Sequence, residues 1–203
     1  LEFRRVLFRS LQCYFEPAEI GLEQTPEDFV KQMVEVFREV KRVLRDDGTL
    51  WLNLGDTYSA TRWSKGGGQG INAYSDDHRS MQHAKNSGLP DKNLIGIPWR
   101  VALALQSDGW YLRQDIIWHM PNPMPESVED RCTKAHEYIF LLSKKPHYYY
   151  DHEAVKESTV NNAEKKNKRS VWTVNAKGYK GAHFAVYPEN LIEPCVLAGC
   201  PKD

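Results

Sequence analysis

The clearest pattern in the chain is an amphipathic helix that leads directly into a short buried strand. Apolar side chains recur at helical spacing over residues 29–44, with charged residues on the other faces. Thr25 and Pro26 are typical of a helix start, and Asp46-Asp47-Gly48 ends the pattern. The run Thr49–Leu54 is uncharged and rich in strand-forming residues, so we predict a buried strand there. A helix followed at once by a buried strand is typical of an α/β fold.

The same alternation continues through the second half of the chain. The predicted elements are, in order, a helix from Pro98, strands at 110–119, 136–144 and 171–174, and a helix from Pro188. The helix from Pro98 is almost continuously apolar, which predicts deep burial. A proline-rich turn separates the first two of these strands, so we expect them to pair as a long hairpin. The sequence therefore predicts an α/β architecture in which helices cover the faces of a sheet.

The stretch 57–92 is polar and shows no sustained period, and the chain turns polar again between Tyr148-Tyr149-Tyr150 and Ser170. The first is longer than a compact domain normally holds without a purpose, so we expect a functional or disordered loop. Its glycine run at 66–70 neither directly follows a strand nor opens an apolar helix, which favours a flexible loop over a phosphate-binding site. The second stretch holds the one basic cluster, which fits a solvated linker as well as phosphate contacts. This cluster consists of Lys165, Lys166, Lys168 and Arg169.

Charge and composition exclude several classes of protein. The 27 basic and 27 acidic residues cancel, so any affinity for DNA must come from a local patch. No run approaches the roughly 18 apolar residues of a membrane span, and no signal peptide is evident. We therefore expect a cytoplasmic protein without a membrane partner. Neither the cysteines nor the histidines have the spacing of a disulfide or zinc framework, so we expect no metal and predict free thiols at Cys13, Cys132, Cys195 and Cys200.

Residues 1–18 differ in character from the rest of the chain. Leu1–Ser10 has three arginines among apolar residues and no turn chemistry that joins it to the next segment. We predict that residues 1–18 are foreign to the domain or disordered, with a buried amphipathic strand at 1–10 as the alternative. The domain is then expected to cover residues 19–203.

The ends of two predicted strands carry the candidate site. In open α/β sheets, ligands bind at the carboxyl ends of the strands. Gly55–Tyr58 and His119–Pro125 come directly after two of the predicted strands, and they combine polar, aromatic and proline residues. On physical grounds these two segments are the candidate ligand-binding residues.

Five groups of segments, taken in their order along the chain, resemble one enzyme family. They are Asp46–Tyr58, Ile95–Arg100, Ile116–Trp118 with Pro121–Glu126, His136–Phe140, and His183–Ala185 with Pro188 and Leu191. The chain resembles, over about residues 19–201, the S-adenosylmethionine-dependent DNA methyltransferases that methylate exocyclic amines of adenine or cytosine. The motif order is similar to that of the permuted members found in restriction-modification systems. The resemblance implies a partial class I, Rossmann-like methyltransferase sheet flanked by helices.

The resemblance also implies roles for individual residues and partners. It places Asp56, Tyr58, Trp118, Asn122 and Pro123 in the pocket for the target base. It places His183, Phe184, Ala185 and Pro188 beside S-adenosylmethionine. The basic cluster is the candidate for contacts with the phosphates of double-stranded DNA because of its charge. It makes 57–92 and 146–182 the target-recognition regions and a cognate restriction endonuclease a candidate partner. Alternatively, Trp118 is an ordinary core aromatic, Asp56 only caps a turn, and Phe184 is a core anchor.

The catalytic motif of the family is missing from this sequence. These enzymes carry Asp, Asn or Ser followed by Pro-Pro and an aromatic residue, whereas this chain has no Pro-Pro pair. We therefore assign no catalytic residue and expect a chain truncated at both ends, without the catalytic and cofactor strands, and inactive as it stands. Strand Thr49–Leu54 would then have an unpaired edge that favours aggregation. Met120 also departs from the family, which usually has lysine before its Pro-Asn pair.

These patterns leave three candidate functions. The first is DNA amino-methylation, in which the base is flipped out and its poorly nucleophilic amine is held near the methyl donor. The second is a catalytically degenerate DNA-binding module that relies on the basic cluster. The third is an unrelated hydrolase with Asp56 and His119 as an acid–base pair, although the sequence shows no nucleophile elbow.

Overall fold

A computed structural model describes residues 20–21, 23–59, 87–158, 165–176 and 186–201. The described helices and strands are α2 (Pro26–Val43), β1 (Thr49–Leu54), α4 (Ile97–Ser107), β2 (Tyr111–His119), β3 (His136–Ser143), β4 (Glu157–Ser158), β5 (Lys165–Lys166), β6 (Val171–Thr173) and α5 (Glu189–Gly199). Strands β1, β2, β3 and β6 lie within one residue of their predicted bounds. The predictions for residues 1–18, for the glycine run at 66–70 and for His183, Phe184 and Ala185 fall outside the described residues.

Four strands form one mixed sheet in the order β1-β3-β2-β6. Strand β3 is antiparallel to both β1 and β2, and β6 runs parallel to β2. The predicted hairpin of β2 and β3 is therefore confirmed. Strands β1 and β2 run in the same direction, so their carboxyl ends lie at the same end of the sheet. Among the described residues β1 pairs with β3 alone, so the free edge that we expected is present. Aggregation through this edge stays a prediction.

Helix α2 forms as its sequence predicts. The Thr25 hydroxyl accepts a hydrogen bond from the Asp28 backbone N–H at 3.1 Å, and Pro26 occupies the first turn. Met33 and Phe37 are buried, which confirms the apolar face. These local signals determine where the helix begins and which of its sides packs against the core.

Helix α4 differs from its prediction in two ways. It begins at Ile97 rather than Pro98, after Gly96, whose φ of 79° suits glycine. Val101 and Leu105 are fully buried, but Leu103 is 49% exposed. Deep burial is therefore confirmed for one side of the helix but not for the side of Leu103, because the sheet and α2 cover only part of its circumference.

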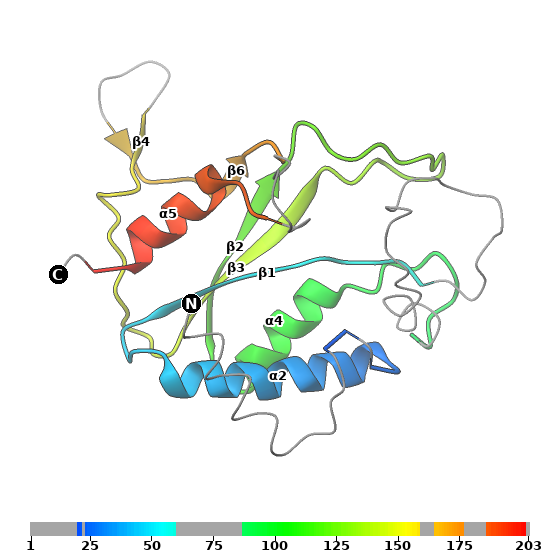
Figure 1. The fold of residues 1–203 in the computed structure, drawn as a ribbon, viewed down its shortest axis with the longest axis horizontal. Coiled ribbons are helices and arrows are strands. Elements are labelled where there is room, and N and C mark those ends of the chain that lie inside the picture. Colours follow the sequence, from blue (N-terminus) through cyan, green and yellow to red (C-terminus); the bar gives the residue numbers. More distant parts are fainter. Residues whose placement is uncertain (1–19, 22, 60–86, 159–164, 177–185, 202–203) are drawn as a thin grey trace.

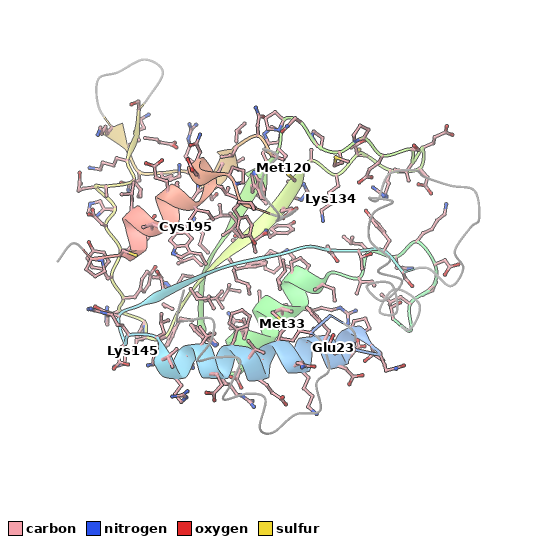
Figure 2. All side chains as sticks on the ribbon, in the orientation of Figure 1. Glu23, Met33, Met120, Lys134, Lys145 and Cys195 are labelled. Atoms are coloured by element: carbon pink, nitrogen blue, oxygen red, sulfur yellow. The ribbon has the colours of Figure 1, made fainter. Side chains whose placement is uncertain are left out.

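Helices cover both faces of the sheet, as Figure 1 shows, with α2 and α4 on one side and α5 on the other. The α2/α4 layer packs on Leu52, Phe140 and Leu142, while the α5 layer packs on Trp118, Ile139 and Trp172. Figure 2 marks Met33 in the first layer and Cys195 in the second.

A register shift in β2 lets side chains of this strand pack into both layers. Leu112 packs with the α2/α4 layer and Ile116 with the α5 layer, although an even spacing in a regular strand places both on one face. The shift lies between Leu112 and Gln114, where an extra residue reverses the alternation.

Candidate functional site

Asp56 lies just after β1 and holds the start of α4. Its Oδ1 accepts hydrogen bonds from the backbone N–H groups of Thr57 at 2.9 Å, Gly96 at 2.9 Å and Ile97 at 3.0 Å. A carboxylate at a helix N-terminus satisfies unpaired N–H groups and complements the helix dipole. Gly96 offers no side chain to do this, so the aspartate serves as a cap supplied from a distant part of the chain. Asp56 therefore caps the start of a helix rather than only a turn, which was the alternative offered by the sequence.

Tyr58 lies next to the loop between β2 and β3. The Arg131 guanidinium lies 4.3 Å from the centre of the Tyr58 ring, within the range of a cation–π contact. Arg131 also forms an ion pair with Glu126. These contacts join the end of β1 to the loop that contains Pro123.

Trp118 and Asn122 hold the chain that leaves β6. The Trp118 Nε1–H donates to the Val174 carbonyl at 2.8 Å, and the side chain is only 6% exposed. The Asn122 amide donates to the Ala176 carbonyl and accepts from its N–H, both at 3.0 Å. The predicted base-pocket residues thus form two groups, Asp56 with Tyr58 near α4 and Trp118 with Asn122 near β6, and each makes contacts within the protein.

Three residues that the sequence analysis did not single out meet at the same end of the sheet. Asn53 on β1 donates through Nδ2 to Glu137 Oε2 at 3.0 Å and to the Tyr138 carbonyl at 2.8 Å. The Tyr187 hydroxyl donates to Asn53 Oδ1 at 3.2 Å. The Tyr187 ring lies 6.5 Å from the Trp118 ring, centre to centre. Asn53, Trp118, Glu137 and Tyr187 are called the sheet-end cluster below.

Of the three residues that the sequence analysis did not single out, only Asn53 could have been recognised from the sequence. Asn53 is an amide among the mostly apolar residues of the run TLWLNL, and a polar group in a buried strand needs a partner. Nothing local indicates that Tyr187 supplies it. Burial raises the pKa of Tyr187 above its usual value, and the negative charge of Glu137 adds to the shift.

The sheet-end cluster fits a cationic cofactor by its chemistry. The sulfonium of S-adenosylmethionine is a cation, and aromatic rings and carboxylates suit cations. Trp118 and Tyr187 supply rings, and Glu137 supplies the carboxylate. Pro188, expected beside the cofactor, is the residue immediately before α5 and comes directly after Tyr187. The chemistry of these described residues is therefore compatible with the cofactor that the resemblance implies.

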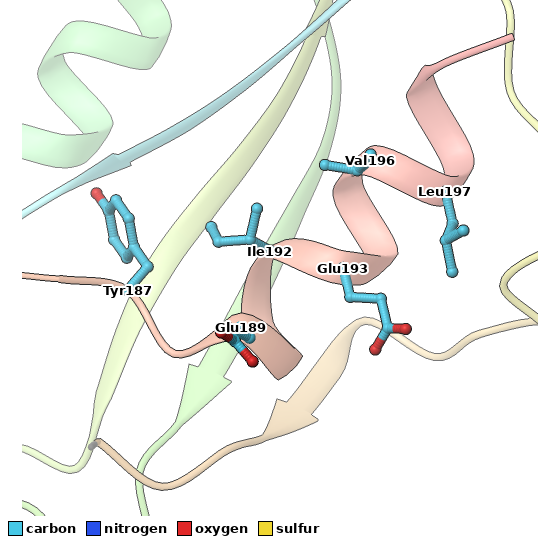
Figure 3. Close-up of a pocket in the computed structure, with 6 residues that line it drawn as sticks. All are labelled: Tyr187, Glu189, Ile192, Glu193, Val196 and Leu197. Atoms are coloured by element: carbon cyan, nitrogen blue, oxygen red, sulfur yellow. The ribbon is translucent and has the colours of Figure 1, made fainter. Parts of the chain in front are cut away.

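An open hollow of about 440 Å³ lies on the outer side of α5 (Figure 3). Its lining is mainly aliphatic, with two carboxylates. The lining residues are Tyr187, Glu189, Ile192, Glu193, Val196 and Leu197. Tyr187 thus belongs both to this hollow and to the sheet-end cluster.

The basic cluster is divided in the structure. Lys165 and Lys166 are exposed on β5, which pairs with β4 in a hairpin that projects from the body in Figure 1. Arg169 forms an ion pair with Glu157, and the Lys168 ammonium lies 4.9 Å from the centre of the Trp172 ring. Two of the four predicted phosphate contacts are therefore engaged within the protein.

Three further predictions concern thiols, metals and membranes. Cys132, Cys195 and Cys200 are free, as predicted, while Cys13 lies outside the described residues. Within the described ranges, no three His, Cys, Asp or Glu side chains are grouped so that they could bind a metal ion. No helix of that part of the chain is long and apolar enough to cross a membrane.

Comparisons with known proteins agree with this architecture. Residues 13–203 match a family model for N6/N4 methyltransferases, described as DNA methylase. The Type II methyltransferase M.SmaI of Serratia marcescens is 49% identical over 195 residues, which cover 94% of this chain and 65% of that protein. This chain therefore spans about 65% of the length of that relative.

Solved structures show the same fold. The PvuII DNA methyltransferase, described as cytosine-N4-specific, matches 93% of this chain and 60% of its own, with a TM-score of 0.61 and 16% identity. The protein TTHA0409 of Thermus thermophilus, solved in complex with S-adenosyl-L-methionine, matches 93% of this chain and 70% of its own, with a TM-score of 0.52 and 18% identity. The α/β sheet is thus the Rossmann-like sheet of methyltransferases, and the chain belongs to the N6/N4 DNA methylase family.

Proposed function

We propose that the protein is a site-specific DNA methyltransferase, which transfers a methyl group from S-adenosylmethionine to an exocyclic amine of adenine or cytosine. The observation that carries this proposal is the 49% identity to a Type II methyltransferase across nearly the whole chain. The complex of TTHA0409 with S-adenosyl-L-methionine supports the choice of cofactor. Double-stranded DNA is the proposed substrate, and a restriction endonuclease of the same sequence specificity is the proposed biological partner.

The described residues would shape the pocket more than touch the base. When bound, S-adenosylmethionine supplies an electrophilic methyl group. The target amine is a poor nucleophile because its lone pair is delocalised into the ring, so the base must be flipped and held. Trp118 is 6% exposed, so it would support the proposed pocket rather than contact the base with its ring face. Asp56 and Asn122 fix the backbone around this pocket through the hydrogen bonds described above.

We further propose that this 203-residue chain does not transfer methyl groups by itself. The sequence has no Pro-Pro-aromatic motif to accept hydrogen bonds from the target amine and to stack on the base. Without those groups the amine is not held in line with the methyl donor, and positioning supplies much of the catalysis in such a reaction.

The test is methyl transfer from radiolabelled S-adenosylmethionine into duplex DNA. The protein expressed from its whole genomic reading frame should label DNA, and the 203-residue chain should not. Labelling by neither protein, together with salt-dependent duplex binding, would favour the catalytically degenerate DNA-binding module instead. Labelling by the 203-residue chain would contradict the proposed inactivity.

We propose that the β4–β5 hairpin contacts DNA phosphates through Lys165 and Lys166. Each lost phosphate contact should reduce the slope of log K against log salt by about 0.9. The double variant K165A/K166A should therefore bind duplex DNA more weakly and with a slope smaller by up to about 2. A matched control is R169A, whose guanidinium is engaged by Glu157 and should change the slope less. An unchanged slope in K165A/K166A would contradict the proposed contact between the hairpin and DNA.

The hydrolase alternative receives no support from the geometry. Asp56 Oδ1 is bound to three backbone N–H groups, and His119 Nδ1 lies 3.2 Å from the Thr173 hydroxyl. In the described part of the chain these two side chains share no hydrogen bond. Asp56 and His119 therefore do not form an acid–base pair in this structure.

A further inference from the structure

Tyr187 links the segment that enters α5 to the end of strand β1. Its hydroxyl donates to Asn53 Oδ1, and residues 53 and 187 are 134 positions apart in the sequence. The orientation of the Asn53 amide is fixed, because Glu137 and the Tyr138 carbonyl only accept hydrogen bonds and so must face Nδ2. Oδ1 is therefore left to accept from Tyr187. Each partner in this chain of hydrogen bonds determines the position of the next.

The two ends of this chain of hydrogen bonds belong to different parts of the proposed site. Asn53 lies in the strand that leads to Asp56, on the side of the proposed target-base pocket. Tyr187 directly precedes Pro188, on the side of the proposed cofactor. Glu137 lies opposite Trp118 in the antiparallel register, so the same link also reaches β2. The three side chains thus connect the cofactor side of the site to the base side.

We propose that Tyr187 is a positioning residue, which sets the cofactor-binding segment against the target-base pocket through Asn53 and Glu137. This inference rests on the proposed methyltransferase function. Methyl transfer requires donor and acceptor atoms in near-contact geometry, and a small displacement of either lowers the rate strongly. The Tyr187 hydroxyl therefore affects the rate without touching either reacting atom.

The first test measures the hydrogen-bonded link without any reaction. Phenol ionisation is followed by ultraviolet difference absorbance of the 203-residue chain, with Y187F identifying the signal of Tyr187. We expect a phenol that titrates above the usual pKa of 10.0 and that titrates lower in E137Q, since glutamine keeps the oxygen acceptor but removes the charge. Tyr150 is an internal control, because its raised pKa arises from burial and from Tyr148 and Cys195 rather than from Glu137. N53A, which removes the hydrogen-bond acceptor itself, should also lower the pKa of Tyr187, since the hydrogen bond that the hydroxyl donates stabilises the neutral phenol. A Tyr187 pKa that is unchanged in both E137Q and N53A would overturn the link.

The second test is kinetic and uses the protein expressed from its whole reading frame. Loss of one hydrogen bond in Y187F should raise the KM for S-adenosylmethionine about fivefold, and misplacement should lower kcat about tenfold. The KM for DNA and the melting temperature should stay close to those of the parent protein, which a general loss of structure would not allow. The matched control is Y111F, since Tyr111 is exposed at the start of β2, far along the strand from Trp118.

A double-mutant cycle separates a link from two independent effects. If Tyr187 acts through Asn53, the variant Y187F/N53A should be no slower than the slower of the two single variants. Kinetics of Y187F that match those of Y111F would overturn the positioning role. Absence of methyl transfer by the parent protein would instead defeat the proposed function and with it the positioning role, while the titration would still decide whether the link exists.

Discussion

The two faces of the sheet are covered in different ways. On one face, α2 and α4 pack against each other and bury side chains such as Phe37, Val101 and Leu105. These helices are also joined at their surface by the ion pairs Arg38–Asp108 at 2.6 Å and Arg100–Glu27 at 2.7 Å. Such exposed pairs contribute little individually, so most of the stability of this layer comes from its apolar packing.

On the other face, α5 is the only helix among the residues that the structure describes. It has eleven residues, contains Pro194, and has no side-chain hydrogen bond at its N-cap. An internal proline removes one helical hydrogen bond. Ile192, Val196 and Leu197 remain 38%, 50% and 40% exposed on its outer side. This layer therefore has fewer interactions to hold it than the α2/α4 layer.

The difference separates the more extensively packed layer from the layer that carries the sheet-end cluster. Asn53 and Trp118 of the sheet-end cluster lie on the α5 face, and Tyr187 leads into α5 itself. Segments that bind ligands are usually drawn from the less stable parts of a fold, because binding requires local movement. The α2/α4 layer, in contrast, fixes the strands on which the site is built.

The largest expected effect is in the α2/α4 layer, at Phe140. This side chain has no exposed surface and lies 5.0 Å from the Trp99 ring, centre to centre. F140A should lower the free energy of unfolding by about 3–5 kcal/mol, because it removes a buried ring and leaves a cavity. Urea denaturation measures this change, with L103A as control, since Leu103 is 49% exposed. A loss below about 1 kcal/mol would contradict the packing described for this layer.

The next effect concerns Leu191 of α5, whose side chain is only 1% exposed. L191A should lower the free energy of unfolding by about 2–3 kcal/mol. We expect this loss to come mainly from detachment of α5 while the other layer stays folded. Burial raises the pKa of the neighbouring Cys195 thiol to about 11, so its alkylation in the parent protein should be slow. The variant should alkylate at Cys195 much faster.

Mass spectrometry distinguishes Cys195 from the exposed thiols of Cys132 and Cys200, which should react at similar rates in both proteins. I192A is the matched control, because the side chain of Ile192 is 38% exposed. If urea unfolding and Cys195 alkylation change together and to the same extent, the two layers are one cooperative unit and the distinction drawn between them fails.

A smaller effect is expected at Asp56, which caps α4 from outside the helix. D56A should lower the free energy of unfolding by about 1 kcal/mol and should speed hydrogen exchange at the amides of Gly96 and Ile97. D56N keeps the Oδ1 acceptor and should retain most of the stability. In the protein expressed from its whole reading frame, a loss of methyl transfer in D56A without faster exchange would show instead that Asp56 acts on the base.

The smallest effect is the pH dependence at Asp46. Hydrogen bonds from Lys145 and Lys144 lower the pKa of this carboxyl from 3.8 to about 2. A pKa lowered on folding adds stability above the unfolded value, and this contribution is lost as the pH falls from about 4 to 2. D46N should therefore reduce stability slightly at neutral pH and not at pH 2. High salt should weaken the difference, since the groups are exposed. An equal effect at both pH values would contradict the ion-pair origin.

Much of the fold could be predicted from the sequence, and less of the site. Thr25, the helical period of residues 29–44 and the run TLWLNL each act within a few residues, so the start of α2 and the bounds of β1 could be predicted directly. The order of the motifs identified the family, which the match to the DNA methylase model confirms. For the site, sequence patterns placed candidate residues after β1 and β2 but did not show what each one contacts.

The sequence by itself determined the elements other than β4 and β5, their order and the family. Tertiary structure alone decided that β3 lies between β1 and β2, that a register shift turns β2 toward both layers, and that Asp56 caps α4. It also brought Tyr187 to Asn53 across 134 positions. The physical reason is that caps and periodicities depend on neighbouring residues, whereas strand order and long-range hydrogen bonds depend on how complete elements pack together.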